Sequence, residues 1–300
     1  MDIIKNRQRL SEFGLFYSAV IWGSTFFVVK DALQNVDPMI LVGYRFLLAA
    51  IFAGGFCIVA KKALFKNVVH GLLLGFLSWL LYASQTIGLS FTTASNSGFI
   101  TGLFIVFVPI FALIVFRKAP SLMDIIATCF SLSGLWILTG GLTEINLGDI
   151  LTIISAVTYA LHILLVDRYI REGDNPFVLS FQQFLVTGAI SLSYGVLFGL
   201  PFSVFKAETV GVILFLALLP TFSAFLIQNL AQKFVKPIRV SLILAFEPVF
   251  AALFAWTLGN ELLVFHRAIG GFFIVGGLII SGIPRRAAGI QKSSESNKLD

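Results

Sequence analysis

Charged residues are scarce in this sequence. Only 12% of its 300 residues are Asp, Glu, Lys or Arg, whereas 58% are hydrophobic and 32 are Phe. A soluble globule of this length cannot bury so much apolar side chain, because its surface needs a larger polar share. The composition therefore predicts a chain that lies in a bilayer, with no stretch left over for a soluble domain.

Cysteine and the motifs of common enzymes are also nearly absent. Cys57 and Cys129 are the two cysteines, and both fall inside apolar segments, so we expect neither a disulfide nor a metal site. The sequence contains no G-x-x-x-x-G-K-[ST] loop for ATP and no H-E-x-x-H motif. We therefore expect no cofactor, no catalytic residue and no ATP-binding subunit. A nucleic-acid partner is not expected either, because no basic run or RNA-binding motif is present.

Apolar segments fill almost the whole chain. Each is close to the length of roughly 20 residues that crosses a bilayer as a helix, and prolines or charges mark the breaks between them. We predict an all-α polytopic membrane protein with a tail over residues 1–10, a disordered tail over 284–300 and ten spans. The predicted spans are Ser11–Val29, Pro38–Ala60, Val68–Leu89, Thr93–Phe116, Leu122–Gly141, Gly148–Val166, Pro176–Gly199, Thr209–Gln232, Pro237–Gly259 and Val264–Ile283.

The last five segments resemble the first five in order. The string SAVIWGSTFFVVKDAL from Ser18 aligns with SAVTYALHILLVDRYI from Ser155, and FVPIFAL from Phe107 aligns with FEPVFAA from Phe246. Because five is an odd number, a second copy enters the membrane in the opposite orientation. We predict two inverted five-helix repeats, over residues 11–145 and 146–283, with a substrate site between them, as is usual in secondary transporters.

Lysine and arginine fall mainly on one side of this predicted topology. With the N-terminus inside, 17 of the 21 Lys and Arg residues lie at the inner ends of the spans or in the tails. Such a bias predicts that both termini are cytoplasmic. It also accounts for the net charge of +6 without any polyanionic partner.

Polar and aromatic side chains recur at helical spacing in three repeat-related pairs of spans. Residues at i, i+4 and i+7 share one face of a helix, and polar groups in hydrocarbon turn toward a cavity or a partner helix. The alternative is that small polar residues only allow helices to pack closely. The predicted cavity residues are Trp22, Thr25, Tyr82, Gln85, Asn96, Phe99, Tyr159, His162, Gln228 and Glu247.

Glu247 and His162 are the candidates for coupling transport to protons. Glu247 lies about 15 Å into its predicted span at 1.5 Å per residue. It either binds a substrate amine or a proton, or it pairs with a partner or caps the backbone that Pro248 frees. His162 is a candidate because imidazole titrates near neutrality, although a lone histidine on an apolar helix is more often a packing residue.

Arg45 is the other charge that lies well within a span. Its guanidinium group suits a substrate carboxylate. Arg45 lies nearer the outer surface, where it can also extend toward water or pair with Asp31 or Asp37. The sequence favours such a structural role, because this span is not among those that carry the polar stripes.

Five sequence motifs resemble those of a known family. They are IWGSTFF from Ile21, the Pro38-x6-Arg45 pattern, TTASNSGFITGLFIVFVPIFA from Thr92, AFEPVFAALFAW from Ala245 with Glu261 after it, and IGGFFIVGGLII from Ile269. Together they resemble the EamA-type ten-helix members of the drug/metabolite transporter superfamily, over about residues 11–283. The resemblance implies a basket of helices around a central cavity, with the fifth and tenth helices peripheral. It also implies similarity to exporters of small polar metabolites in the bacterial inner membrane.

The sequence thus favours a secondary transporter that moves a small polar or amphipathic metabolite across the inner membrane by alternating access. The aromatic residues on the candidate helices suit an amino acid or a related compound, and export is the expected direction. An importer or exchanger of the same fold, for example for a nucleoside-like cofactor, is the nearest alternative. A channel or an intramembrane enzyme is a weaker one, and the oligomeric state is open.

Overall fold

The computed structural model describes residues 2–139, 145–204, 206–257 and 265–281, and it is helical throughout these ranges apart from short connections. The predicted tail over 284–300 and Glu261 lie outside them. The helices are α1 Asp2–Ala32, α2 Pro38–Val59, α3 Val68–Leu89, α4 Ala94–Gly102, α5 Phe104–Ile114, α6 Leu122–Thr139, α7 Leu147–Arg171, α8 Pro176–Leu197, α9 Ala207–Leu216, the π-helix η1 Ala217–Ser223, α10 Ala224–Ala231, α11 Pro237–Leu244, α12 Glu247–Thr257 and α13 Phe265–Ser281.

Hydropathy and length mark most of these helices as membrane spans. Eight helical segments of the described ranges are long and apolar enough to cross a bilayer, and two shorter apolar helices lie over Leu122–Leu138 and Ile269–Ser281. The fold is therefore that of a polytopic helical membrane protein. The number of ten spans and the cytoplasmic location of the termini stay predictions.

Local sequence explains where several helices begin. Pro38, Pro176 and Pro237 each occupy the first helical position, where the missing N–H has no intrahelical partner to lose. The side chain of Asp37 caps α2 by accepting a hydrogen bond from the backbone N–H of Met39 at 2.8 Å. These helix boundaries could be predicted from the sequence, because each depends on residues that are neighbours in the chain.

Three predicted spans are interrupted where the sequence suggested single helices. The span over Thr93–Phe116 is divided at Leu103 into α4 and α5, and the span over Pro237–Gly259 is divided at residues 245–246 into α11 and α12. The third, Thr209–Gln232, contains η1. Proline explains two of these interruptions: Pro248 and Pro220 lack the N–H that would continue the helical ladder, and the proline ring collides with the carbonyl four residues earlier.

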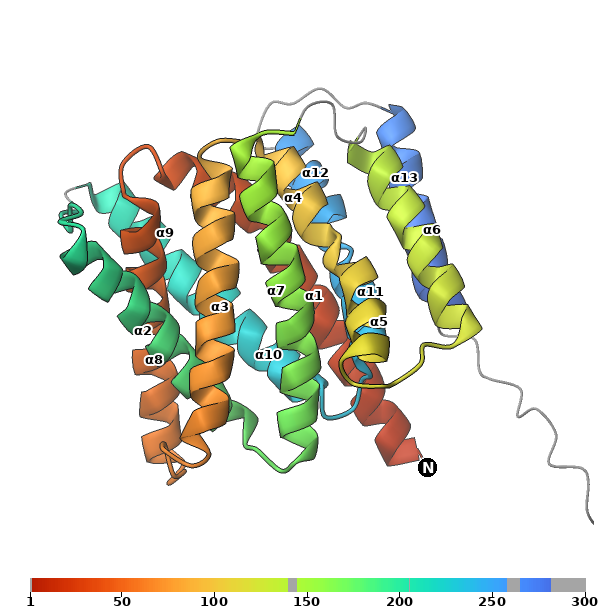
Figure 1. The fold of residues 1–300 in the computed structure, drawn as a ribbon, viewed down its shortest axis with the longest axis horizontal. Helices are drawn as coiled ribbons and strands as arrows, with labels where there is room; N and C mark the ends of the chain where they lie inside the picture. The colour runs from red at the N-terminus through yellow and green to blue at the C-terminus, as the bar shows by residue number, and fades with distance from the viewer. Residues whose placement is uncertain (1, 140–144, 205, 258–264, 282–300) are drawn as a thin grey trace, which may run out of the picture.

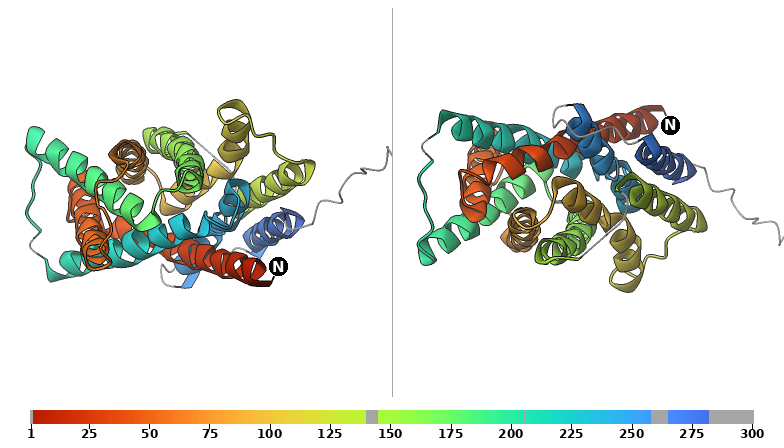
Figure 2. Two further views of the ribbon diagram at one scale, coloured as in Figure 1. Left: turned by 90° about the horizontal axis from the view of Figure 1, so that it is seen from below. Right: turned by 90° about the horizontal axis from the view of Figure 1, so that it is seen from above.

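The helices form one bundle with a pair at its edge (Figure 1). α1 crosses the interior and packs on α10 and α12, while α3 packs on α7 and α8, and α2 packs on α8. α6 and α13 pack on each other at one end, and α8 and α9 form the opposite end (Figure 2). This peripheral pair is the one that the family resemblance implied.

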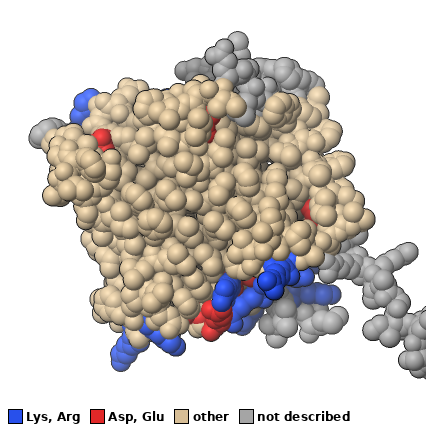
Figure 3. All heavy atoms as spheres, viewed as in Figure 1, with Lys and Arg blue, Asp and Glu red and all other residues tan. Residues whose placement is uncertain are grey.

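Basic side chains gather at the end of the bundle where the N-terminus lies. Figure 3 shows Lys and Arg at this lower end, whereas the middle of the visible face is uncharged. Large apolar side chains such as Ile51, Phe76 and Leu113 are exposed on the spans. An apolar belt with charged ends is the surface that a bilayer requires.

Glycine permits the closest helix crossings. A Cβ atom on Gly88 of α3 would lie 2.8 Å from the carbonyl oxygen of Gly148 on α7, and a Cβ atom on Gly134 of α6 would lie 2.5 Å from that of Gly270 on α13. Backbone-to-backbone contact of this kind is typical of small residues at membrane helix interfaces.

We predict that Gly148→Ala lowers the free energy of unfolding by about 1–3 kcal/mol, because its methyl group would overlap the carbonyl oxygen of Gly88 on α3 and the backbone nitrogen of Thr92. Gly55→Ala is the matched control, because a Cβ atom at Gly55 of α2 meets no atom within 4 Å. It should leave stability unchanged or raise it by about 0.5–1 kcal/mol through better helix propensity. Thermal unfolding in detergent measures both, and equal melting temperatures for the two variants would contradict the assigned crossing.

Candidate functional site

The interruption between α11 and α12 places Glu247 inside the bundle. α11 ends at Leu244, and α12 begins at Glu247, one residue before Pro248. α1 passes this point in backbone contact: a Cβ atom on Gly23 would lie 2.7 Å from the carbonyl oxygen of Glu247. Discontinuous helices of this kind supply many of the binding sites of secondary transporters.

A small cavity lies beside Glu247. It is lined by residues of α1, α3, α4, α7 and α12, namely Trp22, Thr25, Leu81, Tyr82, Gln85, Thr101, Tyr159 and Glu247. Its volume of about 20 Å³ admits about one water molecule. Both halves of the chain contribute walls, so a solute larger than water requires those walls to move apart.

Glu247 is the charged residue of this cavity. Its side chain is 6% exposed, and within the described part of the chain its carboxylate has neither a hydrogen-bond donor nor a cationic partner. A buried carboxylate without a partner is costly unless it is protonated, hydrated or paired with a ligand. The cavity therefore contains a group that is poised to accept a cation or a proton.

Arg45 lies deep in the bundle and neither extends toward water nor pairs with Asp31 or Asp37. It is 3% exposed, and its Nε donates a hydrogen bond to Thr221 Oγ1 at 2.6 Å. Its guanidinium carbon lies 4.7 Å from the centre of the Tyr82 ring. The expected extension toward water or pairing with Asp31 or Asp37 is wrong, because Arg45 is on the buried face of α2, about two turns below Pro38.

Arg45 also keeps an unused donor. Its Nη2 is buried and has no hydrogen-bond partner, and no carboxylate of the described ranges forms an ion pair with it. Tyr82 thus contacts both surroundings, since it lines the Glu247 cavity and its ring lies against Arg45.

Helix α1 stabilises the wide turn of η1. Trp22 Nε1 donates to the carbonyl oxygen of Pro220 at 2.7 Å, and Ser18 Oγ donates to that of Ala224 at 3.1 Å. Thr221 Oγ1, which accepts from Arg45, donates to the carbonyl oxygen of Leu216 at 2.7 Å. π-Helical turns are rare and frequent at functional sites. The hint in the sequence was Pro220 in the middle of an apolar segment.

Two predicted residues, Gln228 and His162, lie behind the cavity wall. Tyr159 donates through its hydroxyl group to Gln228 Oε1 at 3.1 Å, and Gln228 Nε2 donates to Gln232 Oε1 at 3.3 Å. His162 is fully buried, and its Nε2 lies 2.7 Å from Gln183 Oε1. Gln228 therefore orients the Tyr159 hydroxyl group, while His162 joins α7 to α8.

Asn96 and Phe99 lie elsewhere on α4. The backbone N–H of Asn96 belongs to the first turn of that helix, where it donates to Thr93 Oγ1. Phe99 is buried against Trp136 of α6, with ring centres 6.0 Å apart. The structure thus brings together Trp22, Thr25, Tyr82, Gln85, Tyr159 and Glu247, and not the other four predicted residues.

Thr101 and Leu81 line the cavity although the sequence analysis did not single them out. Thr101 Oγ1 accepts a hydrogen bond from Gln85 Nε2 at 3.0 Å. Thr101 immediately precedes Gly102, where α4 ends. A glycine next to a threonine inside an apolar span was the available signal for it, whereas Leu81 carries no signal beyond its position next to Tyr82.

We predict that Trp22→Phe lowers the free energy of unfolding by about 1–3 kcal/mol, because it leaves the buried Pro220 carbonyl without its donor. Trp79→Phe is the matched control, since the Trp79 Nε1 has no hydrogen-bond partner to lose. Thermal unfolding of both variants measures the difference. A loss of equal size in the two would show that ring volume, and not the hydrogen bond, determines stability here.

Known proteins resemble this chain along nearly its whole length. The pattern of the EamA-like transporter family matches residues 9–140 and 146–283. An uncharacterized transporter of Archaeoglobus fulgidus is 33% identical over 90% of this chain and 85% of its own length. The uncharacterized transporter YyaM of Bacillus subtilis is 26% identical over 89% and 92%.

A solved crystal structure shares the fold. It is 17% identical in sequence and superposes with a TM-score of 0.77, over 91% of this chain and 96% of that one. The relatives are transporters by name, and the matched family is one of transporters. With a helical, membrane-spanning fold and a central cavity lined by both halves, the chain belongs to the EamA-like transporter family.

Proposed function

We propose that this chain is a secondary transporter that exports a small polar or amphipathic metabolite, an amino acid or a related compound, across the bacterial inner membrane. The observation that carries the proposal is the buried, unpaired carboxylate of Glu247 at a helix interruption, in a cavity lined by both halves of the chain. The export direction rests on the resemblance to exporters of small polar metabolites.

The chemistry of the cavity walls supports a substrate with an amine and an apolar portion. The Glu247 carboxylate attracts an ammonium group, and the rings of Trp22, Tyr82 and Tyr159 provide both apolar contact and cation–π attraction. Gln85 and Thr25 supply uncharged hydrogen-bonding groups. A proton and an ammonium group compete for one carboxylate, so substrate release and protonation of Glu247 become alternative events.

Arg45 supports a zwitterionic substrate. Its guanidinium group carries a free Nη2 donor and lies against the ring of Tyr82, which also lines the cavity. A movement of Tyr82 that exposed Arg45 to the cavity would let the guanidinium group and the Glu247 carboxylate face the same substrate. Guanidinium binds carboxylates with good geometry, so the two charges together match the two ends of an amino acid.

The small volume of the cavity fits a contracted intermediate of alternating access. The cavity has room for about one water molecule, and its lining residues Thr25 and Gln85 are only partly buried, so a larger solute requires the cavity to widen. α1, which contacts both η1 and the α11–α12 interruption, is the element whose displacement would open the cavity. The Lys and Arg residues at the lower end (Figure 3) support a cytoplasmic location for that end.

Counterflow in proteoliposomes tests the proposal. Vesicles that contain the purified protein are preloaded with one unlabelled compound from a panel of amino acids, nucleosides and other metabolites, and uptake of the labelled compound is followed. Saturable, transient accumulation of an amino acid or related amine is the expected result. Flux that rises linearly with concentration would indicate a channel, and no counterflow by folded protein with any panel member would contradict the proposal.

Glu247→Gln should reduce the counterflow rate by about 10- to 100-fold at low substrate concentration, because a hydrogen bond to a charged group contributes about 1.5–3 kcal/mol. Glu208→Gln is the matched control, since Glu208 is exposed at the start of α9 and lies outside the cavity. Unchanged transport by Glu247→Gln would remove this carboxylate from the mechanism.

A further inference from the structure

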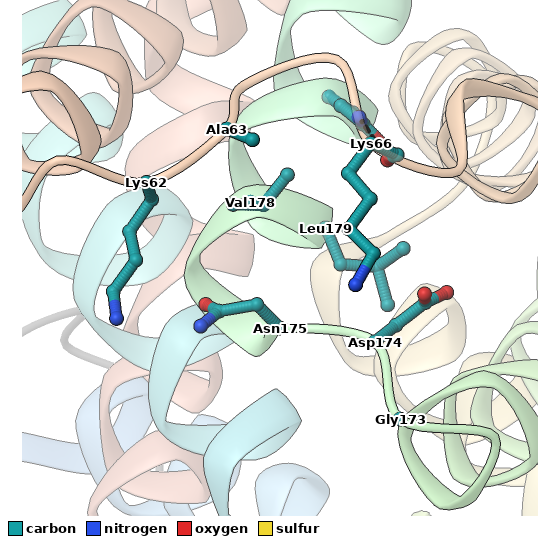
Figure 4. A pocket seen from close by; sticks show the side chains of 9 residues that line it. Lys62, Ala63, Lys66, Gly173, Asp174, Asn175, Val178 and Leu179 are labelled. Atoms are coloured by element: carbon teal, nitrogen blue, oxygen red, sulfur yellow. Dashed lines mark hydrogen bonds between the residues drawn. The ribbon is translucent and has the colours of Figure 1, made fainter.

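A second and larger cavity lies at the end of the molecule that carries the basic residues. Its volume is about 260 Å³, and it separates the α2–α3 connection from the α7–α8 connection (Figure 4). Its lining residues do not overlap with those around Glu247. They include Lys62 and Lys66 on one side and Asp174, Asn175 and Gln182 on the other.

Helix ends build both walls of this cavity. Lys61 adopts a positive φ of 51°, and the N–H of Lys62 donates to the carbonyl oxygen of Cys57 at 2.8 Å, which closes α2 in a Schellman motif. Gly173, with φ of 99°, closes α7 in the same way, and the N–H of Asp174 donates to the carbonyl oxygen of Tyr169. Each motif fixes the backbone next to a lining side chain.

Gln182 holds the two walls together. From α8, its Nε2 donates to the carbonyl oxygens of Leu64 and Lys66, at 2.8 and 2.9 Å. The side chain of Gln182 is 5% exposed, and its Oε1 is without a partner. The α2–α3 connection is thus anchored over the cavity by a buried amide, so the cavity is already formed before any ligand binds.

The cavity offers donors and positive charge. Neither Lys62 nor Lys66 forms an ion pair with any described residue, and both extend toward the α7–α8 connection in Figure 4. The carboxylate of Asp174 is already engaged by Asn67 Nδ2 and His70 Nδ1. Asn175 accepts from the N–H of Phe177 through Oδ1, which leaves its Nδ2 as a donor.

We propose that this cavity binds a phosphate group, either the phosphodiester of an anionic phospholipid headgroup or a free phosphate. Two unpaired ammonium groups and an amide N–H match an anion with several acceptor oxygens. The cavity lies at the basic end of a membrane-spanning bundle, where anionic headgroups meet basic pockets between helices. Bound there, the phosphate bridges the two connections and stabilises the packing of α2 and α3 on α7 and α8.

The test compares thermal stability of the full chain with and without each phosphate source. The chain is placed in nanodiscs of phosphatidylcholine alone or with phosphatidylglycerol, and separately in neutral detergent with and without inorganic phosphate. Phosphatidylglycerol should raise the melting temperature, and Lys62→Gln/Lys66→Gln should lose most of that rise. Lys233→Gln/Lys236→Gln, which removes two basic residues of the α10–α11 connection outside the cavity, is the matched control and should keep it.

Asn175→Asp provides a second variant that keeps the fold. Its side-chain oxygen still caps α8, but it replaces the amide donor with a negative charge that repels an anion, so the rise should again be lost. A response to inorganic phosphate alone that depends on Lys62 and Lys66 would support the same site with a soluble ligand. The proposal would be overturned if the melting temperature rose equally in all variants. It would also be overturned if neither phosphatidylglycerol nor inorganic phosphate raised the melting temperature of the unsubstituted chain.

Discussion

A backbone carbonyl released inside a bilayer has no water to bind, and this constraint determines how the centre of the molecule is built. Every interruption of a spanning helix exposes such groups, so another element must supply donors. Here α1 supplies them through Trp22 and Ser18, whose side chains bind the carbonyl oxygens of Pro220 and Ala224. The interrupted span, α9 through α10, is therefore stable only with α1 beside it.

The same constraint explains why the cavity lies where it does. α1 approaches the α11–α12 interruption through Gly23, and this contact brings Trp22 and Thr25 to the same level as Glu247. Polar side chains therefore surround a point where the helix is already interrupted. This arrangement suits a transporter. An interrupted helix already lacks backbone hydrogen bonds at the break, so it can bend there without breaking others.

The sequence predicted the parts of this architecture that depend on local chemistry. The span over Val68–Leu89 was placed correctly because apolar length and flanking residues determine it. Helical spacing singled out five of the cavity residues, and Glu247 was singled out as a charge deep within a span. The position of Arg45 along its span was predicted, but the burial of its side chain was not, because that depends on how α2 meets η1, a contact between residues 176 positions apart. The role of Gln182 was missed for the same reason, since its partners are distant in sequence, whereas the π-turn had a local signal in Pro220.

The central claim is that the space around Glu247 opens to each side of the membrane in turn. Thr25→Cys, in a chain where Cys57 and Cys129 are replaced by Ser, places one thiol in the wall of that space. Transport-active vesicles of this variant are treated with a membrane-impermeant maleimide from the outside or from the lumen. The account predicts labelling from either side, and labelling from one side only, or from neither, would contradict it.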